Sequence, residues 1–359
     1  MKNIIDFIKE KSYYFLGGTV LLLILIIAIS SCSTGGESYS SIENNMKSAA
    51  KKYYTDNEDL LPTQIGNSVK VSLDTLIEIE YLKEVKDPNN KNNLCTGYVE
   101  VVKLEEDYSY VPMLKCKDNY EPEYLVDIIK KSGTDDIGNG IYEINGEFIY
   151  RGENINNYVL FNDIVWRIVK INSNGNIKLV AANKSEDTYS WDTRYNSDKG
   201  YSYGITTDYK LTNMRKTLNE YYNNIFTNDN KGKIVLEKIC IGSCNENSYD
   251  KTQECTKTIE DEYVSLLNLS DYQIASLDAG CTNPMKKECV NRNYLNSNDI
   301  NTWLLNPVEG YSFKMYVLNG STYYTNASNV KKINPVIYLN KNVITVEGKG
   351  TLEAPYKIK

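Results

Sequence analysis

An uncharged and mostly apolar run, YYFLGGTVLLLILIIAIS, occupies residues 13–30 and leads directly into Ser31 and Cys32. As a helix it would rise roughly 27 Å, which is about the thickness of the hydrocarbon core of a bilayer. Lysines lie on its N-terminal side, and the first charge after it is Glu37. This asymmetry predicts a cytoplasmic segment or signal n-region at 1–12, a membrane segment at 13–30, and a long C-terminal part on the extracellular face of the cell membrane.

Two interpretations of this segment remain open. Small residues before Cys32 are typical of a bacterial lipoprotein signal, in which the thiol of Cys32 is lipidated after cleavage. The length of the run and the acidic residues Asp6 and Glu10 in its flank favour an uncleaved signal anchor instead. Both place the exported part in the same compartment, joined to the membrane through a short tether at residues 31–41.

Composition excludes several function classes. The net charge is −7 with acidic and basic residues interspersed, so no basic stripe predicts a nucleic-acid partner. The chain contains no histidine, which excludes Ser–His–Asp and Cys–His nucleophiles and the usual zinc sites. We expect no cofactor and no metal, and an enzyme is disfavoured, although catalysis by carboxylates, Tyr or Lys stays open. Residues 196–208 carry Asp and Asn but lack the spacing of a calcium loop.

The cysteines agree with an oxidising exterior. Seven follow Cys32, and no histidine or matching cysteine pair accompanies Cys240 and Cys244 to suggest a metal site. Disulfides are therefore the expected state of these thiols. They are Cys95, Cys116, Cys240, Cys244, Cys255, Cys281 and Cys289.

The region 42–120 predicts a small domain of two helices and a hairpin. Apolar residues recur at helical spacing from Ile42 to Tyr54, and Ser72 can cap a second helix that extends to Ile79. Strands at 95–103 and 108–116 flank a short acidic turn. Folding them symmetrically about that turn places Cys95 opposite Cys116, which predicts a disulfide between them.

These elements, together with the membrane span and the segment SLDTLIEIEYLKEVKDPNN, resemble type IV pilins and pseudopilins over residues 13–120. The resemblance implies a pilin-like α/β hairpin domain. Thr34-Gly35-Gly36 separates the span from the helix, whereas pilins have one continuous helix. We therefore expect a pilin-like spacer rather than a pilus subunit.

Residues 121–139 predict a linker that can include a short helical turn, and the chain then becomes β-rich. Asn145-Gly146 between two short apolar runs indicates a type I′ hairpin. A helix is predicted at 211–226. Further strands are expected at 158–161, 164–171, 177–181, 313–318, 321–325, 335–339, 343–346 and 356–358.

The motifs FNDIVWRIVKI, SWDTRYN, LLNLSDYQIAS, NTWLLNP and the tail from INPVIYL to APYKI occur in order over residues 140–359. They resemble a bacterial surface domain with the C-type-lectin-like fold that formylglycine-generating enzymes also have. The resemblance implies long loops on a disulfide-stapled scaffold. Either Cys240 or Cys244 pairs with Cys255, and Cys281 pairs with Cys289. We expect Cys240–Cys255, which leaves Cys244 unpaired.

The three tryptophans have different surroundings in the sequence. Trp166 lies mid-strand among Ile and Val, and Trp303 lies in a similar apolar segment, so both are predicted core residues. Trp191, Asp192, Arg194 and Tyr195 instead lie in a loop rich in Gly, Ser and Asn. An aromatic face beside directed polar groups suits sugar or peptide recognition, although a buried Trp pinned by an Asp–Arg pair explains the same pattern.

Together these features predict an α+β chain: a membrane-anchored pilin-like domain followed by a β-rich, C-type-lectin-like domain. The expected function is a surface-anchored, non-enzymatic binding or adhesion protein, whose partners are the membrane and an extracellular glycan, cell-wall polymer or protein. One rival hypothesis is an envelope enzyme that uses Asp and Glu on a glycan substrate. The other is a structural component of a pilus-like or secretion assembly.

Overall fold

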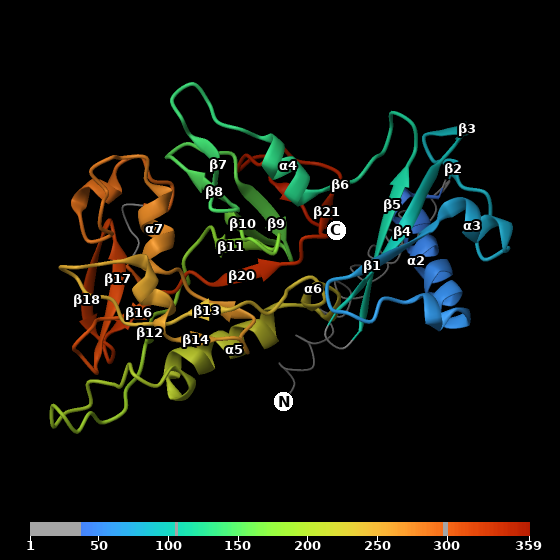
Figure 1. Cartoon of the computed structure of the whole chain (residues 1–359). Coiled ribbons are helices and arrows are strands. Elements are labelled where there is room, and N and C mark those ends of the chain that lie inside the picture. Colours follow the sequence, from blue (N-terminus) through green and yellow to red (C-terminus); the bar gives the residue numbers. More distant parts are fainter. Residues whose placement is uncertain (1–36, 105–106, 297–300) are drawn as a thin grey trace, which may run out of the picture. The chain divides into compact units, whose positions relative to one another are not determined.

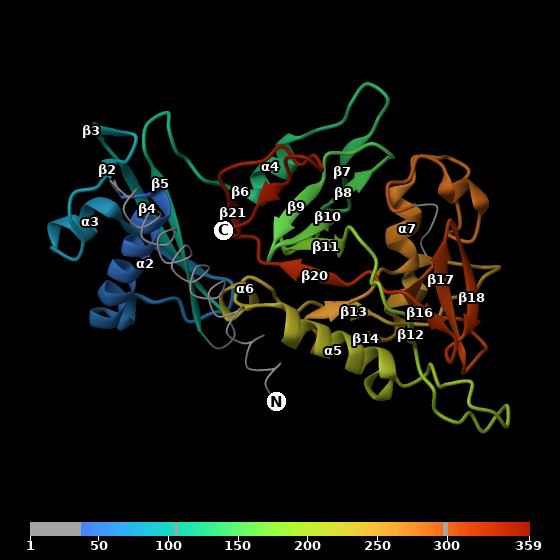
Figure 2. The ribbon, with the colours of Figure 1, turned by 180° about the vertical axis from the view of Figure 1, so that it is seen from behind.

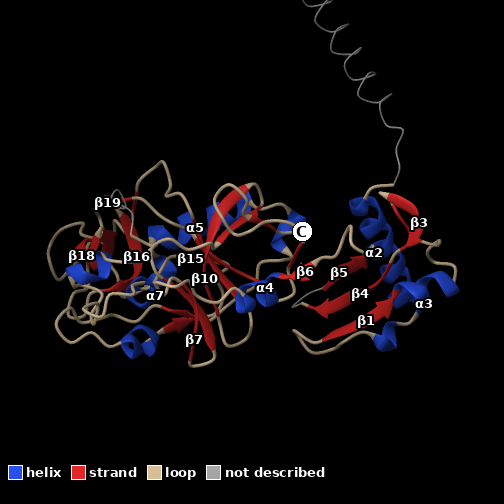
Figure 3. Cartoon of the chain, turned by 90° about the horizontal axis from the view of Figure 1, so that it is seen from above, coloured by secondary structure: helices blue, strands red, loops and turns tan. Residues whose placement is uncertain are grey.

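The computed structural model describes residues 37–104, 107–296 and 301–359. The chain divides into two compact units, Met1–Glu121 and Pro122–Lys359. Helices and strands occur in both, so the chain is α+β as predicted (Figures 1 and 3). Within the described ranges, no helix has both the length and the apolar character needed to cross a bilayer. The predicted span at 13–30 and Cys32 lie outside the described residues.

The first unit is built on one long helix, α2 (Tyr39–Asp56), as the helical spacing predicted. It begins at Ser38, whose side chain accepts a hydrogen bond from the backbone N–H of Ser41 at 3.1 Å. One face of the helix is buried and packs on the sheet of this unit (Figure 1). The buried apolar residues on that face are Ile42, Met46, Ala49, Ala50 and Tyr54.

The sheet of the first unit is antiparallel, with the order β1 (Ser68–Ser72), β4 (Thr96–Lys103), β5 (Tyr108–Lys115). Ser72 ends β1 and caps α3 (Leu73–Glu78), as predicted, by accepting from the N–H of Thr75 at 2.9 Å. The sequence analysis missed β1, since only Val71 in it is buried. The remaining elements are a single turn η1 (Glu58–Leu60) and the small hairpin β2 (Lys86–Asp87) and β3 (Asn90–Leu94).

The predicted register of the β4–β5 hairpin is the observed one. Thr96 lies opposite Lys115, and the pairing continues without a shift to Lys103 opposite Tyr108. One position further out, Cys95 and Cys116 form a disulfide with their Cα atoms 4.3 Å apart. The bridge closes the open end of the hairpin and is buried in the core of the unit.

The prediction of a linker at 121–139 is wrong. Residues Glu123–Tyr124 form β6, which pairs with β21 (Ile344–Thr345), and Leu125–Lys131 form the helix α4. Leu125 and Ile129 are fully buried in the core of the second unit. This pair at i and i+4 is enough to fix one short helix on that core, although the charged residues around it suggested an exposed connection.

The second unit contains a large sheet whose strands β15, β20, β11, β10, β8 and β7 are neighbours in that order. A further strand, β9, pairs with β10 and, in parallel, with β22. The predicted turn at Asn145-Gly146 is present, with φ of +53° and +78°. The strands are β7 (Gly140–Ile144), β8 (Glu147–Arg151), β9 (Tyr158–Phe161), β10 (Ile164–Ile171), β11 (Ile177–Ala181), β15 (Val264–Ser265), β20 (Val336–Leu339) and β22 (Tyr356–Lys357).

A second antiparallel sheet consists of β16 (Thr302–Pro307), β17 (Lys314–Asn319) and β18 (Ser321–Asn326), and α7 (Leu269–Ala275) lies beside it. The helix α5 (Asn213–Ile225) runs along the short pair β13–β14 (Figures 1 and 2). The short elements are β12 (Tyr189–Ser190), β13 (Ile239–Cys240), β14 (Thr258–Ile259), β19 (Val330–Lys331), α6 (Asn228–Lys231), η2 (Tyr209–Leu211), η3 (Lys251–Thr256) and η4 (Lys287–Val290).

The core of the second unit contains Trp166 and Trp303, both buried as predicted. The indole N–H of Trp166 donates to the carbonyl of Phe161 at 3.1 Å, and that of Trp303 donates to the carbonyl of Tyr189 at 2.7 Å. Two disulfides hold the loops, Cys240–Cys255 and Cys281–Cys289, and Cys244 is a free, buried thiol. This is the pairing that the sequence analysis expected.

Candidate functional site

The four residues singled out in the loop after β12 have three different positions. Trp191 is buried, with its ring centre 6.2 Å from that of Trp303 and 6.0 Å from that of Tyr209. Asp192 is also buried, and Arg194 is partly covered beside it. Tyr195 is 62% exposed on the surface. The sequence cluster is therefore not one contact surface.

Asp192 and Arg194 hold the shape of this loop. The Asp192 carboxylate accepts from the Arg194 guanidinium at 2.9 Å and from the backbone N–H of Arg194 and Ile205 at 2.8 and 3.1 Å. Gly204 packs so tightly on it that a Cβ there would lie 2.4 Å from the Asp192 carbonyl oxygen. Both charged side chains therefore hold the shape of the loop. The shape of the loop in turn fixes the position of Trp191, which precedes them in the sequence.

The disulfide Cys240–Cys255 positions a second segment near Trp191. Its two ends are the strand β13 and the turn η3, and residues 241–243 and 256–257 follow the two cysteines directly. The N–H of Gly242 donates to the carbonyl of Glu254 at 2.6 Å, and a Cβ on Gly242 would lie 2.2 Å from the Gln253 carbonyl oxygen. Only glycine permits this close approach of the two chain segments.

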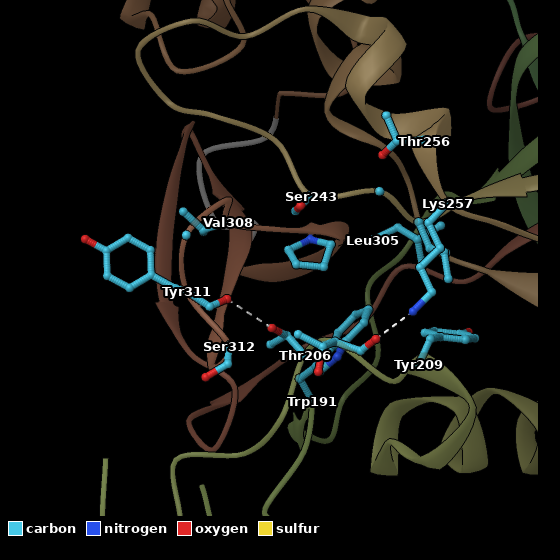
Figure 4. A pocket seen from close by; sticks show the side chains of 15 residues that line it. Trp191, Thr206, Tyr209, Ser243, Thr256, Lys257, Leu305, Val308, Tyr311 and Ser312 are labelled. Carbon is cyan, nitrogen blue, oxygen red and sulfur yellow. Dashed lines mark hydrogen bonds between the residues drawn. The ribbon is translucent and has the colours of Figure 1, made fainter. Parts of the chain in front are cut away.

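The connection between β16 and β17 supplies a third segment. Its backbone is bonded to the loop before η2, because the N–H of Thr206 donates to the carbonyl of Ser312 at 2.8 Å. The Thr206 hydroxyl also donates to the carbonyl of Tyr311 at 3.4 Å. Figure 4 shows that Tyr311 gives its backbone to this contact and turns its ring away from it.

These segments enclose a pocket of about 360 Å³ (Figure 4). Trp191 and Thr206 lie on one side of it and Ser243 on the opposite side. Apolar and hydroxyl-bearing side chains alternate around the wall. The lining residues are Trp191, Thr206, Thr207, Tyr209, Ile241, Gly242, Ser243, Thr256, Lys257, Leu305, Pro307, Val308, Gly310, Tyr311 and Ser312.

The pocket has a single charged group. Of the described residues that line it, Lys257 alone carries a charged side chain, and no Asp or Glu is among them. The Lys257 ammonium donates to the carbonyl of Thr207 at 2.6 Å and so joins two walls of the pocket (Figure 4). A ligand here would meet one ammonium group and several hydroxyl groups.

Two polar atoms of the lining residues are buried without a hydrogen-bond partner, the indole Nε1 of Trp191 and the hydroxyl of Tyr209. Trp191 is 1% exposed and Tyr209 is 4% exposed. Burial and the nearby carboxylate of Glu262 raise the pKa of Tyr209, so its hydroxyl keeps its proton at neutral pH. An unpaired buried donor costs about 1–3 kcal/mol, which most proteins avoid.

Sequence reasoning found Trp191 but missed the rest of the lining. The other walls come from residues 206–209, 241–257 and 305–312, which are far apart in the sequence. The nearest signal was the cysteine pair, since a short disulfide loop beside glycine often forms a rigid wall. Within the described residues, no cluster of three His, Cys, Asp or Glu side chains could hold a metal ion.

We compared the chain with models of protein families, with curated proteins and with solved structures, and no match was found in any of the three. The pocket therefore has to be interpreted from its own chemistry.

Proposed function

We propose that this chain is a surface-anchored, non-enzymatic binding or adhesion protein. In this proposal its second unit is a lectin-like head that binds a saccharide of an extracellular glycan or cell-wall polymer in the pocket beside Trp191. The uncharged run at 13–30 supports the membrane anchor, and the three disulfides suit an oxidising exterior.

The observation that carries the proposal is the unpartnered indole N–H of Trp191. The other two tryptophans of the chain donate to backbone carbonyls at 3.1 and 2.7 Å, whereas Trp191 has no acceptor. In this proposal a ligand oxygen that enters the pocket reaches this N–H and the Tyr209 hydroxyl, since both groups belong to residues that line the pocket. Hydrogen bonds to such a ligand would offset the desolvation cost of those two groups. In the free protein this cost is not compensated.

The rest of the lining supports a saccharide among acceptor-bearing ligands. Sugars present hydroxyl edges and apolar faces, and the wall offers hydroxyl groups (Ser243, Thr256) beside apolar side chains (Ile241, Val308). The volume of about 360 Å³ lies within the range of about 300–1,000 Å³ that is usual for small-ligand sites. Lys257 favours a neutral or acidic sugar over a cationic one.

The pocket gives no support to the rival hypothesis of a carboxylate-based glycosidase. That chemistry needs a pair of carboxyl groups flanking the scissile bond. None of the described lining residues is Asp or Glu. Binding without bond cleavage is the simpler function for this set of side chains.

The test is a binding screen followed by observation of the indole groups. The full chain in detergent is screened against neutral and acidic glycans and cell-wall polymers, and the best sugar is titrated into protein labelled with ¹⁵N-tryptophan. We expect the Trp191 indole signal to shift most and its hydrogen exchange to slow, while Trp166, which donates to Phe161, serves as the internal control. The proposal fails if no saccharide binds, or if a bound saccharide leaves the Trp191 signal unchanged.

A further inference from the structure

Five aromatic rings form a continuous row on the second unit, which we call the aromatic row. Their ring centres follow one another at 5.4 Å (Tyr201–Tyr203), 5.5 Å (Tyr203–Phe313), 6.0 Å (Phe313–Tyr311) and 6.3 Å (Tyr311–Tyr324). Spacings of this size place each ring in contact with the next. The five rings are therefore one connected cluster, in which Phe313 links the two ends, and not a set of scattered side chains.

The row is exposed to solvent over much of its length. Tyr201 is 63% exposed and Tyr311 is 40% exposed, Tyr203 and Tyr324 are half-buried, and Phe313 is buried beneath them. Single exposed aromatic residues need no explanation, but a contiguous row of them indicates an interaction surface.

The backbone around the row is already ordered without a ligand. Asn196 donates from its amide to the carbonyl of Gly204 at 3.0 Å, and its backbone N–H donates to the carbonyl of Tyr201 at 2.9 Å. The carbonyl of Tyr203 accepts from the N–H of Ser328 at 3.2 Å. Because the loop is held at several points, a ligand on the row would not have to order it first.

Lysines lie along the row. The Lys314 ammonium is 3.8 Å from the ring centre of Tyr311 and 4.5 Å from that of Tyr324, and Lys199 is 5.4 Å from that of Phe313. These cation–π contacts orient the rings and add positive charge beside them. The carboxylate of Glu246 also lies close enough to Tyr324 to raise the pKa of its hydroxyl, so the row carries charges of both signs.

The row and the pocket share Tyr311. Its backbone and Ser312 line the pocket, while its ring turns outward to Phe313 and Tyr324 (Figure 4). We propose that the site is an extended one: one sugar unit of a polymer occupies the pocket, and the next units of the same chain stack on the aromatic row. This inference rests on the proposed function, and it deepens it by assigning a polysaccharide chain as the ligand.

Stacking explains why rings, and not only polar groups, would continue the site. The apolar C–H face of a sugar ring packs on an aromatic face, and the hydroxyl edge remains in water. Each step of the row is on the scale of one sugar unit, so the exposed rings, Tyr201 and Tyr311, can meet different units of one chain. Longer oligosaccharides would therefore bind more tightly than short ones, with little dependence on the detailed pattern of hydroxyl groups.

The experiment compares chain lengths. Calorimetry measures the affinity of the full chain for N-acetylglucosamine oligomers and for galacturonic acid oligomers, each from monosaccharide to hexasaccharide. In the series that binds, we expect the hexasaccharide to bind roughly 10–100-fold more tightly than the disaccharide, as a few stacked rings would provide.

Two variants locate the effect. Tyr201→Ala should weaken hexasaccharide binding about three- to tenfold and leave disaccharide binding unchanged. Tyr195→Ala is the matched control, because Tyr195 is equally exposed on the same loop, at 62% against 63%, but is not part of the row. It should change neither affinity.

The outcomes separate this inference from the proposed function. If short and long oligomers bind equally well, or if Tyr201→Ala and Tyr195→Ala behave alike, the extended site is wrong while the pocket stands. If no oligomer of any length binds and the glycan screen is also negative, both proposals fail.

Discussion

In the first unit, Asp87 is fully buried and its carboxylate accepts hydrogen bonds from the Tyr39 hydroxyl at 2.7 Å, the Asn119 amide at 2.6 Å and the Asn89 N–H at 2.9 Å. In the second unit, the buried donors of Trp191 and Tyr209 have no partner. Of the described residues, those of the first unit contain no buried side-chain polar atom without a hydrogen bond.

The size of a hollow does not explain this difference. The first unit has a hollow of about 440 Å³ between α2 and residues 81–85, which is larger than the pocket of about 360 Å³ in the second. Only the smaller one has lining residues, Trp191 and Tyr209, with unpartnered buried donors, and the other unpartnered atoms among the described residues belong to Glu262, Asn296 and Asn334 outside its lining. Under the proposed function, unsatisfied polarity, and not volume, is what distinguishes the unit that presents the site from the unit that acts as a spacer.

The largest expected effect concerns the covalent bridge of the first unit. Replacing Cys95 and Cys116 by Ala should destabilise that unit by about 3 kcal/mol, because the bridge closes a separation of 21 residues. Replacing Cys281 and Cys289, separated by 8 residues, should cost the second unit somewhat less, about 2.5 kcal/mol. Chemical denaturation monitored by amide hydrogen exchange in β4 and α7 measures both, and equal losses in both units for either pair would contradict the comparison.

The next effect is an opposite response of the two units to acid. In the second unit, Glu254 is buried and accepts from Tyr249 and twice from Ser270, at 2.6–2.9 Å. Burial raises the pKa of Glu254 to about 6 from an ordinary 4.5. The folded state then binds the extra proton between about pH 4.5 and 6, so the second unit should gain up to about 2 kcal/mol as the pH falls through that window.

The stability that Asp87 contributes to the first unit changes with pH in the opposite direction. Burial alone would raise the pKa of Asp87, but hydrogen bonds from Asn119, Tyr39 and the backbone outweigh it, and the net shift is downward. Its contribution is complete above the ordinary value near 3.8 and is lost at lower pH. Unfolding free energies of each unit measured from pH 7 to about pH 2 test this, because the loss at Asp87 begins only below the ordinary value near 3.8. Glu254→Gln should remove much of the pH slope of the second unit, and an unchanged slope would contradict the assignment.

The smallest and sharpest effect comes from one chemical change made in each unit. Tyr39→Phe removes a hydroxyl that donates to buried Asp87, so the first unit should lose about 1–2 kcal/mol of stability. Tyr209→Phe removes a hydroxyl with no partner, so the second unit should keep its stability or gain slightly.

Binding should respond in the reverse order. Tyr209→Phe should weaken saccharide binding about two- to tenfold, and Tyr39→Phe should leave it unchanged. Thermal denaturation and calorimetry on both variants measure the four values. A loss of stability in Tyr209→Phe as large as in Tyr39→Phe would mean that the Tyr209 hydroxyl serves the fold.

Local and symmetric features of the fold could be predicted from the sequence. The Cys95–Cys116 bridge followed from counting residues on either side of one turn, and the caps of α3 and the Asn145-Gly146 turn are local as well. The core positions of Trp166 and Trp303 followed from their apolar neighbours.

The pocket could not be predicted, because its walls meet only through long-range contacts. Thr206 bonds to Ser312 and Lys257 to Thr207, across sequence separations that no local pattern encodes. The sequence also did not distinguish Asp192 and Arg194, which hold the loop, from Trp191, which lines the pocket. The sequence allowed a short helical turn at α4 but did not reveal its packing on the core, because its two buried residues, Leu125 and Ile129, are too few to stand out among charged neighbours.

The disulfide bond between Cys240 and Cys255 has a consequence for when the wall of the pocket is completed. Residues 241–243 and 256–257, next to these two sulfurs, are part of the wall around Trp191. A newly made copy that is still in a reducing cytoplasm lacks that covalent closure. Under the proposed function, the wall would be completed only after oxidation, so the chain would become able to bind saccharide only after export.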